Sequence, residues 1–482
     1  MTSAIFLLFF SALVASPGAD IPGLLGQSID TKLAKRAATV EMVYSDGKFS
    51  HLEYGFSEER EPASPTPTGT DHRIVKPRLA EFGACSIREG TLQRNSRRPC
   101  GFIVDISDGK LPINLLSFDT LSIAGKSRGQ WTVALADDRL AAREENYPVG
   151  KLQEGGLSTF PLDKAAGELD LKRMKYLIFI LASNSGELQI EQLGFSRKVL
   201  PPLPLPPPAL WVWDNRPATS DAPSMVRNLK ALNARRIYLQ IGDNLGPLLP
   251  FLEACRQAGI EVFALDGAPS YLDHPDPLLA RVRDVMAFNT RHPDTPFAGF
   301  QIDIEPHLNR DFRLRLGTYG TLYIELLNRI AQITEGKLPL STVIPFWYDT
   351  LLIDNRTLAW HLIRQSDEAV IMSYRTDGAD IEAIAREELL YGERLSKRVL
   401  LGVETGRIPD ELHVTFRKCR EDALTAIAAG GAFWCQSSDY KVPGSKISFM
   451  GKEEALKKQL SRTLPYRSFS GWVIHSYETV QR

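Results

Sequence analysis

From residue 210 to the end of the chain, short apolar runs recur, separated by longer amphipathic stretches. Each run has the length and the Val, Ile and Leu content of a strand that is buried on both faces. The runs cover residues 210–213, 236–241, 261–265, 299–304, 340–345, 369–374, 399–403 and 471–475. Strands of this kind belong to parallel sheets that are covered by helices, so the pattern predicts an α/β fold.

The stretches between the runs place apolar residues at helical spacing. They cover residues 225–232, 248–258, 278–288, 322–333, 381–395 and 419–429. Eight strands alternating with helices over residues 210–482 match a (β/α)8 TIM barrel. The alternative is an open doubly wound sheet, which typically carries a glycine-rich phosphate turn after its first strand. Here the residues after Trp213 are Asp-Asn-Arg-Pro, which favours the barrel.

Residues 74–199 carry a different pattern, with short strands at near-regular spacing. The candidate strands cover residues 101–106, 118–123, 130–135, 157–162, 175–181 and 187–195. This spacing predicts an antiparallel β-sandwich domain in front of the barrel. Residues 200–209 follow, with six prolines between Leu200 and Pro208, and are predicted to form a stiff linker between the two domains.

The N-terminal residues 1–19 combine an apolar run with small residues, which predicts a secretory signal and a secreted or periplasmic protein. An uncleaved anchor and a misassigned start are the alternatives. Residues 20–73 are predicted to be a tail with two short strands and a proline-containing linker. Of the five cysteines, Cys85 and Cys100 are close enough to form a disulfide in an oxidising compartment, whereas Cys255, Cys419 and Cys435 are interpreted as buried thiols.

Charge and composition narrow the class of partner. The chain has 57 basic and 58 acidic residues, so no overall field would attract nucleic acid or an anionic membrane. No apolar run is long enough to span a bilayer. No pair of cysteines has metal-ligand spacing and the histidines are scattered, so no metal and no cofactor is predicted. An uncharged polysaccharide or oligosaccharide suits this balance, and the sequence leaves the oligomeric state open.

The stretch from residue 297 to residue 307 reads Phe-Ala-Gly-Phe-Gln-Ile-Asp-Ile-Glu-Pro-His. Strand alternation places Gln301, Asp303 and Glu305 on one face, at the carboxyl end of the fourth barrel strand. Active sites of parallel barrels lie at this end of the strands. Two neighbouring acids raise the pKa of at least one of them, as a general acid requires. The alternative is a structural ion-pair cluster with nearby arginines.

The other strand ends add polar and aromatic residues at the same mouth. They are Trp213, Asp214, Trp347, Tyr348, Tyr374, Arg375, Glu404, His475, Tyr477 and Glu478. Aromatic rings stack on the apolar faces of sugar rings, and carboxylates bind hydroxyl groups, so this set predicts a sugar-binding cleft.

Three strands carry a family resemblance. The run from Gly299 to Glu305 is similar to the strand-four signature of glycoside hydrolase family 18, the chitinase-like barrels, which ends in Asp-x-Glu. Residues 369–374, ending in Met-Ser-Tyr, resemble that family's strand six, and residues 397–406 resemble its strand seven. The resemblance implies a secreted glycoside hydrolase that cleaves a polysaccharide containing N-acetylhexosamine.

Carried over residue by residue, the resemblance makes Glu305 the general acid. Asp303 would orient and stabilise the substrate's 2-acetamido group as it attacks the anomeric carbon, and Tyr374 would hydrogen-bond that group. The chain departs from the family at Ala298 and Gln301, where earlier aspartates are expected. It also has Arg375 in place of the Asp after the strand-six Tyr.

The sandwich has a weaker resemblance of its own. Its last strand, with Ile190, Leu193 and Phe195, is similar to jelly-roll carbohydrate-binding modules of secreted glycosidases. The resemblance implies glycan binding, with Trp131 and Tyr176 as candidate stacking platforms. A purely architectural sandwich, with these aromatics in its core, is the alternative.

Three other functional readings remain open. Glu305 and Glu404 occupy the acid/base and nucleophile places of retaining two-carboxylate barrel glycosidases. The departures at Ala298, Gln301 and Arg375 favour a barrel that binds carbohydrate without cleaving it. The third reading is a structural protein of the cell envelope that retains a relic barrel.

Overall fold

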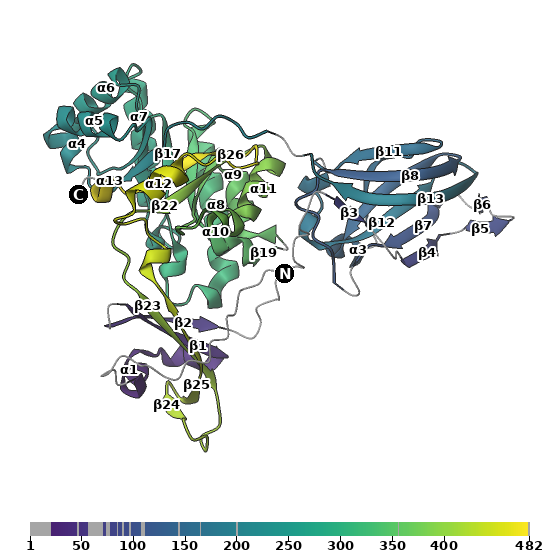
Figure 1. Cartoon of the computed structure of the whole chain (residues 1–482), viewed down its shortest axis with the longest axis horizontal. Coiled ribbons are helices and arrows are strands. Elements are labelled where there is room, and N and C mark those ends of the chain that lie inside the picture. The colour runs from purple at the N-terminus through teal and green to yellow at the C-terminus, as the bar shows by residue number, and fades with distance from the viewer. Residues whose placement is uncertain are drawn as a thin grey trace. The chain divides into compact units, whose positions relative to one another are not determined.

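The computed structural model describes residues 21–45, 48–55, 71–73, 78–83, 85–88, 91–95, 98–107, 111–142, 145–163, 165–198, 201–354 and 356–480. Residues 71–198 form one compact unit, and residues 21–55 together with 202–480 form a second (Figure 1). The predicted signal at residues 1–19 and most of the N-terminal proline-containing linker lie outside the described residues.

The second unit contains a closed barrel of eight parallel strands that follow one another in chain order. The strands are β14 (Ala209–Val212), β15 (Arg236–Gln240), β16 (Glu261–Asp266), β17 (Gly299–Ile302), β18 (Leu340–Pro345), β21 (Glu368–Met372), β22 (Arg398–Glu404) and β26 (Phe469–His475). The ring closes where β26 pairs in parallel with β14. The predicted (β/α)8 barrel is therefore confirmed, and the open doubly wound sheet is excluded.

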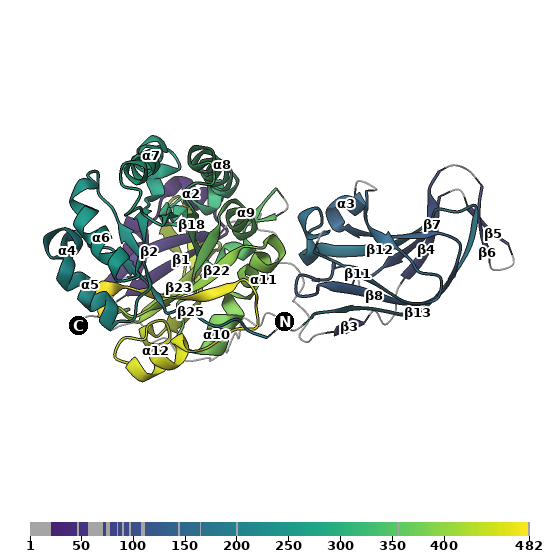
Figure 2. The same ribbon diagram turned by 90° about the horizontal axis from the view of Figure 1, so that it is seen from above.

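Helices surround the barrel, as Figure 2 shows from above. They are α4 (Arg216–Ser220), α5 (Ala222–Ala231), α6 (Leu249–Gln257), α7 (Asp276–Arg291), α8 (Leu316–Thr334), α9 (Leu358–Gln365), α10 (Gly378–Ile384), α11 (Arg386–Leu395), α12 (Glu453–Leu460) and α13 (Tyr477–Val480). Local sequence explains how they begin. Helix α5 starts where the Asp221 side chain accepts a hydrogen bond from the Ser224 backbone, and it buries Met225, Val226 and Leu229.

The floor of the barrel carries a network of buried charges. Glu368, at the start of β21, is 1% exposed and accepts hydrogen bonds from the Tyr238 hydroxyl and from Arg236, each at 2.8 Å. Arg398 lies 3.3 Å from the same carboxylate, and Arg236 also pairs with Glu261. Because these side chains come from the starts of different strands, the network ties the barrel together at the end opposite to the predicted site.

A small antiparallel sheet in the same unit combines residues 39–55 with residues 411–442. Its strand order is β2 (Lys48–Gly55), β1 (Thr39–Ser45), β23 (Glu411–Lys418), β25 (Ala432–Val442) and β24 (Ile427–Ala429). Its buried core includes Leu33 of α2 (Thr31–Arg36), Leu25 of α1 (Ile21–Ser28), Val40, Phe416 and Trp434. Residues 39–55, predicted as part of an N-terminal tail, thus pack with an insertion that follows barrel strand β22.

Two predictions about this insertion are wrong. Residues 419–429 were expected to form a helix, but they form turns that lead into β24. Cys419 and Cys435 were interpreted as buried thiols, but they form a disulfide with Cα atoms 5.8 Å apart. Both errors have one cause, because β23 and β25 lie side by side and bring the two cysteines together at the end of a hairpin. Cys255 is a buried free thiol, as predicted.

Removing the Cys419–Cys435 disulfide should loosen the small sheet without affecting the other unit. The bond joins two cysteines that are 16 residues apart in the sequence. A disulfide typically contributes about 2–4 kcal/mol to the free energy of unfolding. We expect the Cys419→Ala/Cys435→Ala variant to lose hydrogen-exchange protection in β23 and β25 by this amount. Peptides from residues 120–196 provide the internal control. Unchanged exchange in β25 would show that the disulfide does not stabilise the hairpin.

The first unit is an antiparallel β-sandwich. One sheet has the order β10 (Tyr147–Lys151), β9 (Trp131–Asp137), β12 (Met174–Leu181), β7 (Cys100–Asp105), β4 (Arg78–Phe82), and the other has β11 (Gly156–Pro161), β8 (Thr120–Arg128), β13 (Ser185–Ser196), β6 (Thr91–Arg94), β5 (Cys85–Arg88). Strand β3 (Asp71–Arg73) pairs with β13, and α3 (Asp138–Ala142) follows β9. The predicted sandwich fold is confirmed.

Two details of the sandwich bear on its predicted role. Trp131 is 1% exposed and stacks on Phe102, so it is a core residue and not a sugar platform. Tyr176 is half-buried beside an apolar patch that includes Ile178.

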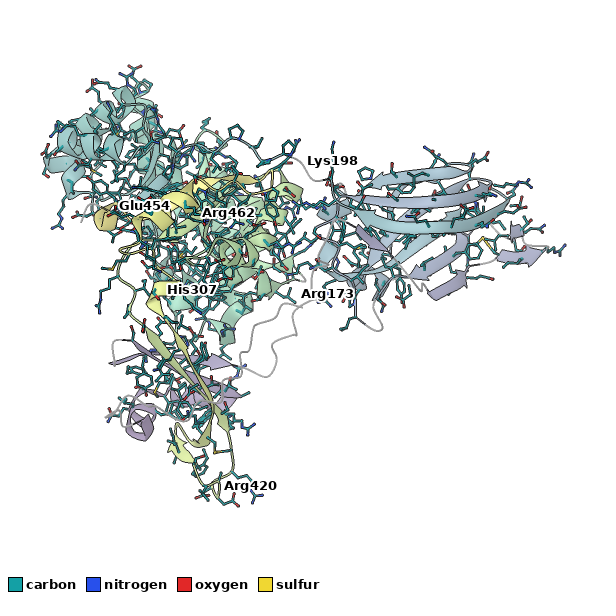
Figure 3. All side chains as sticks on the ribbon, in the orientation of Figure 1. Arg173, Lys198, His307, Arg420, Glu454 and Arg462 are labelled. Atoms are coloured by element: carbon teal, nitrogen blue, oxygen red, sulfur yellow. A yellow bond between two sulfur atoms is a disulfide. The ribbon has the colours of Figure 1, made fainter. Side chains whose placement is uncertain are left out.

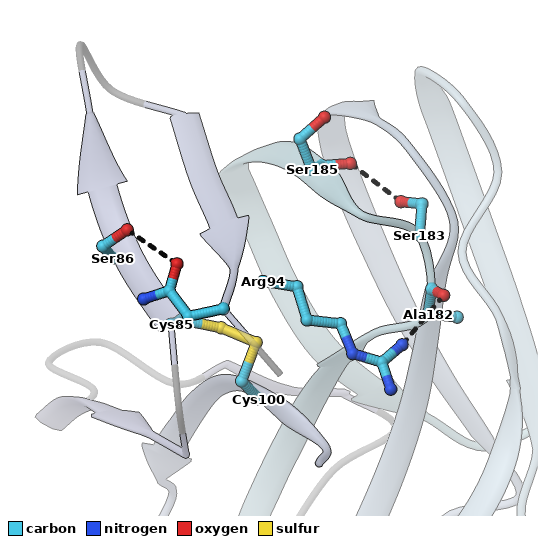
Figure 4. The surroundings of a disulfide bond; sticks show 8 residues. Cys85, Ser86, Arg94, Cys100, Ala182, Ser183 and Ser185 are labelled. Carbon is cyan, nitrogen blue, oxygen red and sulfur yellow. Dashed lines mark hydrogen bonds between the residues drawn. A yellow bond between two sulfur atoms is a disulfide. The ribbon is translucent and has the colours of Figure 1, made fainter. Parts of the chain in front are cut away.

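Cys85 and Cys100 form the predicted disulfide, and nearby the Arg94 guanidinium donates a hydrogen bond to the Ala182 carbonyl (Figure 4).

Candidate active site

The acidic stretch leaves the barrel at the carboxyl end of β17. The strand ends at Ile302, and the Asp303 backbone donates a hydrogen bond to the Asp266 carbonyl at the end of the neighbouring strand β16. Glu305 has a left-handed backbone conformation with φ of 48°, and Pro306 begins a short 3-10 helix, Pro306–Leu308. The Glu305 carboxyl group is near enough to Asp303 to affect the pKa of that residue.

Gln301 lies beneath this pair, inside the barrel. Its side chain is fully buried, and its Oε1 atom accepts a hydrogen bond from the Trp211 indole at 2.6 Å. Its Nε2 atom donates to the Ser341 hydroxyl at 3.0 Å. The predicted strand alternation stops before Asp303, because β17 ends at Ile302 and Glu305 is left-handed. The prediction that Gln301 binds substrate is wrong, because both ends of its amide are occupied in the barrel core.

Burial and proximity change the acidity of the two carboxyl groups. Burial, followed by the neighbouring Glu305, raises the pKa of Asp303 well above its usual range. Burial also raises the pKa of Glu305. The Oδ1 atom of Asp303 is buried without a hydrogen-bond partner among the described residues. The pair therefore retains a proton to higher pH than ordinary carboxyl groups do, which is the property of a general acid.

The structural alternative for this pair required arginine partners. In the described part of the chain, the ionisable group in contact with Glu305 is His307, whose Nε2 atom lies 3.8 Å from the Glu305 Oε1 atom. Neither Asp303 nor Glu305 pairs with an arginine there. The pair is thus a desolvated acid couple and not an ion-pair cluster.

His307 is a site residue that sequence reasoning missed. Burial lowers the pKa of its imidazole to about 4, so the ring is neutral at neutral pH. Its Nδ1 atom lies 3.0 Å from the Tyr348 hydroxyl, and its ring contacts Trp347 edge-on at 5.3 Å. Figure 3 shows His307 on the side of the barrel that faces the small sheet, where Glu53 of β2 is near enough to affect its charge.

Three tyrosines surround the acid pair. They are Tyr323 of α8, Tyr348 of the short 3-10 helix Phe346–Thr350, and Tyr374 after β21. Burial is the main cause that raises the pKa of each phenol well above its usual value, and nearby Asp303 and Glu305 add to it. The phenols therefore remain protonated and can act as hydrogen-bond donors. Tyr323 was not predicted, and Tyr348 is fully buried behind His307, so it supports the site without reaching a ligand.

A second cluster lies where β22 and β26 end. The Glu404 Oε2 atom is 2.7 Å from the His475 Nδ1 atom, and its Oε1 atom accepts hydrogen bonds from the backbones of Thr405 and Gly406. The His475 Nε2 atom lies 2.9 Å from the Trp213 indole nitrogen. Glu404 is 4% exposed, so both of its oxygens are held by protein groups. This arrangement suits a positioning carboxylate better than a free nucleophile.

The remaining predicted residues divide between the rim and the interior. Trp213 is 36% exposed at the rim, and one Glu478 oxygen accepts hydrogen bonds from the backbones of Trp213 and Asp214. Arg375 donates to the Tyr374 carbonyl, and burial lowers the pKa of its guanidinium. Tyr477 is 4% exposed and contacts Asn228, so its predicted role in binding substrate is wrong.

Asp214 and Trp347 also lie on the rim. The Asp214 carboxylate pairs with Arg216, and hydrogen bonds from Arg216 lower the pKa of Asp214. Trp347 is half-buried, with the Arg313 guanidinium 5.6 Å from the centre of its ring. Among the described residues, no group of three or more His, Cys, Asp or Glu side chains is arranged to hold a metal ion. Among the described helices, none is both long enough and apolar enough to span a membrane.

The raised pKa of Asp303 predicts a pH-dependent cost to stability. A neutral Asp303 contributes stability that is fully present below the unfolded pKa of 3.8 and is lost as the pH rises through the higher folded pKa. We therefore expect Asp303→Asn to raise the free energy of unfolding by about 1–3 kcal/mol at about pH 8, with no gain at about pH 4. Urea denaturation at both pH values measures this. The exposed Asp276→Asn is the control, and a gain that does not depend on pH would contradict the assignment.

Comparisons with known proteins give the following findings. No protein-family model matches the chain, and no curated protein matches it. Among solved structures, a chitinase from Bacteroides thetaiotaomicron is 10% identical, with 57% of this chain and 91% of that chain covered and a TM-score of 0.33. A family 18 chitinase from Cycas revoluta in complex with (GlcNAc)3 is 12% identical, with 56% and 95% covered and a TM-score of 0.32.

The sandwich has a separate structural neighbour. A family 29 carbohydrate-binding module, solved with cellulohexaose, is 13% identical, with 26% of this chain and 90% of that chain covered and a TM-score of 0.20. The chain is thus similar to family 18 chitinases and to a carbohydrate-binding module at 10–13% identity. The assignment of the two folds rests on the strand orders described above.

Proposed function

We propose that this protein is a glycoside hydrolase that cleaves a polysaccharide containing N-acetylhexosamine, with Glu305 as the general acid. The observation that carries the proposal is the partly buried Asp303 and Glu305 pair at the carboxyl end of the barrel, with a raised pKa at both groups. The half-buried Trp347 and the exposed Trp213 supply aromatic surface at the same end. Acid groups beside aromatic rims suit a sugar ligand.

The chemistry needs one acid and one stabilising group. Glu305 donates its proton to the glycosidic oxygen while the substrate's acetamido oxygen attacks the anomeric carbon, so the bond to the leaving sugar breaks as a cyclic oxazolinium forms. Asp303 orients the acetamido N–H and stabilises the positive charge of that ring, and the Tyr374 hydroxyl donates a hydrogen bond to the acetamido oxygen. Glu305 then takes a proton from the water that opens the ring.

The environment of Glu404 supports this mechanism over the two-carboxylate alternative. A carboxylate nucleophile must present an oxygen to the anomeric carbon, about 5–5.5 Å from the acid. The oxygens of Glu404 accept hydrogen bonds from Thr405, Gly406 and His475 instead. Within the proposal, Glu404 has a positioning role.

The test is incubation of the purified protein with acetylated and de-acetylated polysaccharides, with products followed by chromatography. The proposal expects products from acetylated substrates and no products when Glu305→Gln replaces the wild type. Cleavage of de-acetylated substrates at an equal rate would favour the two-carboxylate mechanism.

A carbohydrate-binding barrel without catalysis is the second candidate. The observation in its favour is Gln301, whose amide bonds to Trp211 and Ser341 and cannot exchange a proton with Asp303. This candidate expects intact glycans after long incubation, together with retention of the protein on a glycan array.

Export of the protein is part of the proposal. The Cys85–Cys100 and Cys419–Cys435 disulfides support an oxidising compartment, as does the signal-like composition of residues 1–19. Fractionation of expressing cells tests export, because an exported protein is recovered outside the cytoplasm. A cytoplasmic protein would keep these cysteines reduced.

A further inference from the structure

The contact between Trp213 and His475 restricts the protonation of the imidazole. An indole N–H can only donate a hydrogen bond, so the His475 Nε2 atom, 2.9 Å away, must accept it and carry no proton. The proton of a neutral ring then lies on Nδ1, which donates to the Glu404 Oε2 atom at 2.7 Å. We assign this tautomer from the donor and acceptor types of the three groups.

The hydrogen-bonded series Glu404–His475–Trp213 is here called the relay. Backbone contacts of Glu404 fix its inner end. The Glu404 Oε1 atom accepts hydrogen bonds from two successive backbone N–H groups, at 2.9 Å and 2.5 Å. Glu404 therefore holds His475 from the barrel, and His475 is in turn packed by Trp211 and Tyr374, whose ring centres are each 5.7 Å from the imidazole. The imidazole has a defined position between the interior and the rim.

Trp213 is the exposed end of this relay. Its backbone N–H is anchored by Glu478, but its side chain is 36% exposed and meets the His475 ring edge-on at 5.8 Å. The hydrogen bond to His475 Nε2 is thus the polar contact that sets the orientation of the indole at the rim. An aromatic ring held in one orientation binds a sugar face better than one that rotates, because less side-chain entropy is lost on binding.

We propose that His475 is a positioning residue that holds Trp213 as a sugar-stacking platform, and that it does so only while its imidazole is neutral. An imidazolium presents N–H at both nitrogens, so its Nε2 would face the donor of Trp213 and the hydrogen bond would be lost. Glycan binding at this rim would then weaken on acidification. The inference rests on the proposed function in that the ligand of the platform is a glycan.

Other charged or titratable groups lie near His475. Glu404 contacts the ring directly, and Glu305, which follows β17, is near enough to interact electrostatically with the imidazole. Tyr374 packs on the ring, and Glu478 anchors the loop that carries Trp213.

The first test follows Trp213 itself and needs no ligand. The intrinsic fluorescence of the full chain is measured between about pH 5 and pH 8, where an imidazole titrates. Subtracting the signal of Trp213→Phe isolates the emission of Trp213. We expect one titration step in that difference, absent when His475→Gln is the background and present when the remote His292→Gln is the background. A step that persists in His475→Gln, or no step in the wild type, would overturn the inference.

The second test measures binding of N-acetylchitotetraose by calorimetry with a Glu305→Gln background to prevent turnover. His475→Gln keeps an acceptor for Trp213 but cannot titrate, so its Kd should stay within about threefold across this pH range. The Kd with His475 present should rise about tenfold on acidification, and His475→Phe should bind weakly at every pH. A pH dependence that survives in His475→Gln would overturn the inference. No binding by any variant would refute the choice of ligand in the proposed function, while the fluorescence step would still stand for Trp213.

Discussion

Replacing Glu305 with Gln should lower the rate of glycan cleavage by about 10²–10⁴-fold, which is the range that a positioned general acid contributes. The amide keeps the size and hydrogen bonding of the side chain but has no proton to donate to the leaving oxygen. Because Glu305 lies in a left-handed turn before Pro306, the amide should sit in the same place. We expect kcat to fall while KM changes little, measured as the release of reducing ends from an acetylated substrate.

A matched control separates this effect from damage to the fold. Glu325 of α8 is exposed and carries the same side chain, so Glu325→Gln should cleave at the wild-type rate. The thermal midpoint of Glu305→Gln should be equal to or above that of the wild type, because a neutral amide replaces a carboxyl group whose charged form is disfavoured by burial. Wild-type cleavage by Glu305→Gln would exclude Glu305 as the acid.

Replacing Glu368 with Ala should have the largest effect on stability. Glu368 is 1% exposed and neutralises Arg236 from the floor of the barrel, with Arg398 and Tyr238 also bound to it. Removing it leaves the partly buried Arg236 guanidinium short of a counter-charge, and breaking a buried pair in this way costs about 3–5 kcal/mol. Urea denaturation followed by tryptophan fluorescence measures the loss.

Glu261 provides the comparison, because it pairs with the same arginine from a position where its side chain is 55% exposed. We expect Glu261→Ala to cost no more than about 1 kcal/mol, as exposed ion pairs do. Similar losses for the two variants would mean that burial does not determine the strength of this network.

The barrel was predictable from the sequence, because its strands are short, mostly apolar runs separated by helical stretches, as in a sheet that is covered on both faces. The small sheet was not predictable. Strand β1 pairs with β23 in a register that joins Thr39 to Arg417, and no local pattern reports a partner so distant in the chain. The same gap explains the Cys419–Cys435 disulfide, because the two cysteines meet only when β25 lies beside β23.

The sequence predicts where the two acids lie but not which side chains surround them. Asp303 and Glu305 come just after the end of barrel strand β17, as the pattern predicts, and their catalytic role stays a prediction. The roles of Gln301 and Tyr348 depend on depth in the barrel, and both side chains proved fully buried. His307 was missed because its neutral state results from burial, which the run Glu-Pro-His does not reveal.

The most direct measurement of the central claim is the anomeric configuration of the first product, followed by proton NMR during cleavage of an acetylated oligosaccharide. Attack by the acetamido group and then by water inverts the anomeric carbon twice, so the account predicts retained configuration and no cleavage of the de-acetylated sugar. An inverted product, or equal cleavage of the de-acetylated sugar, would contradict the roles given to Asp303 and Glu305.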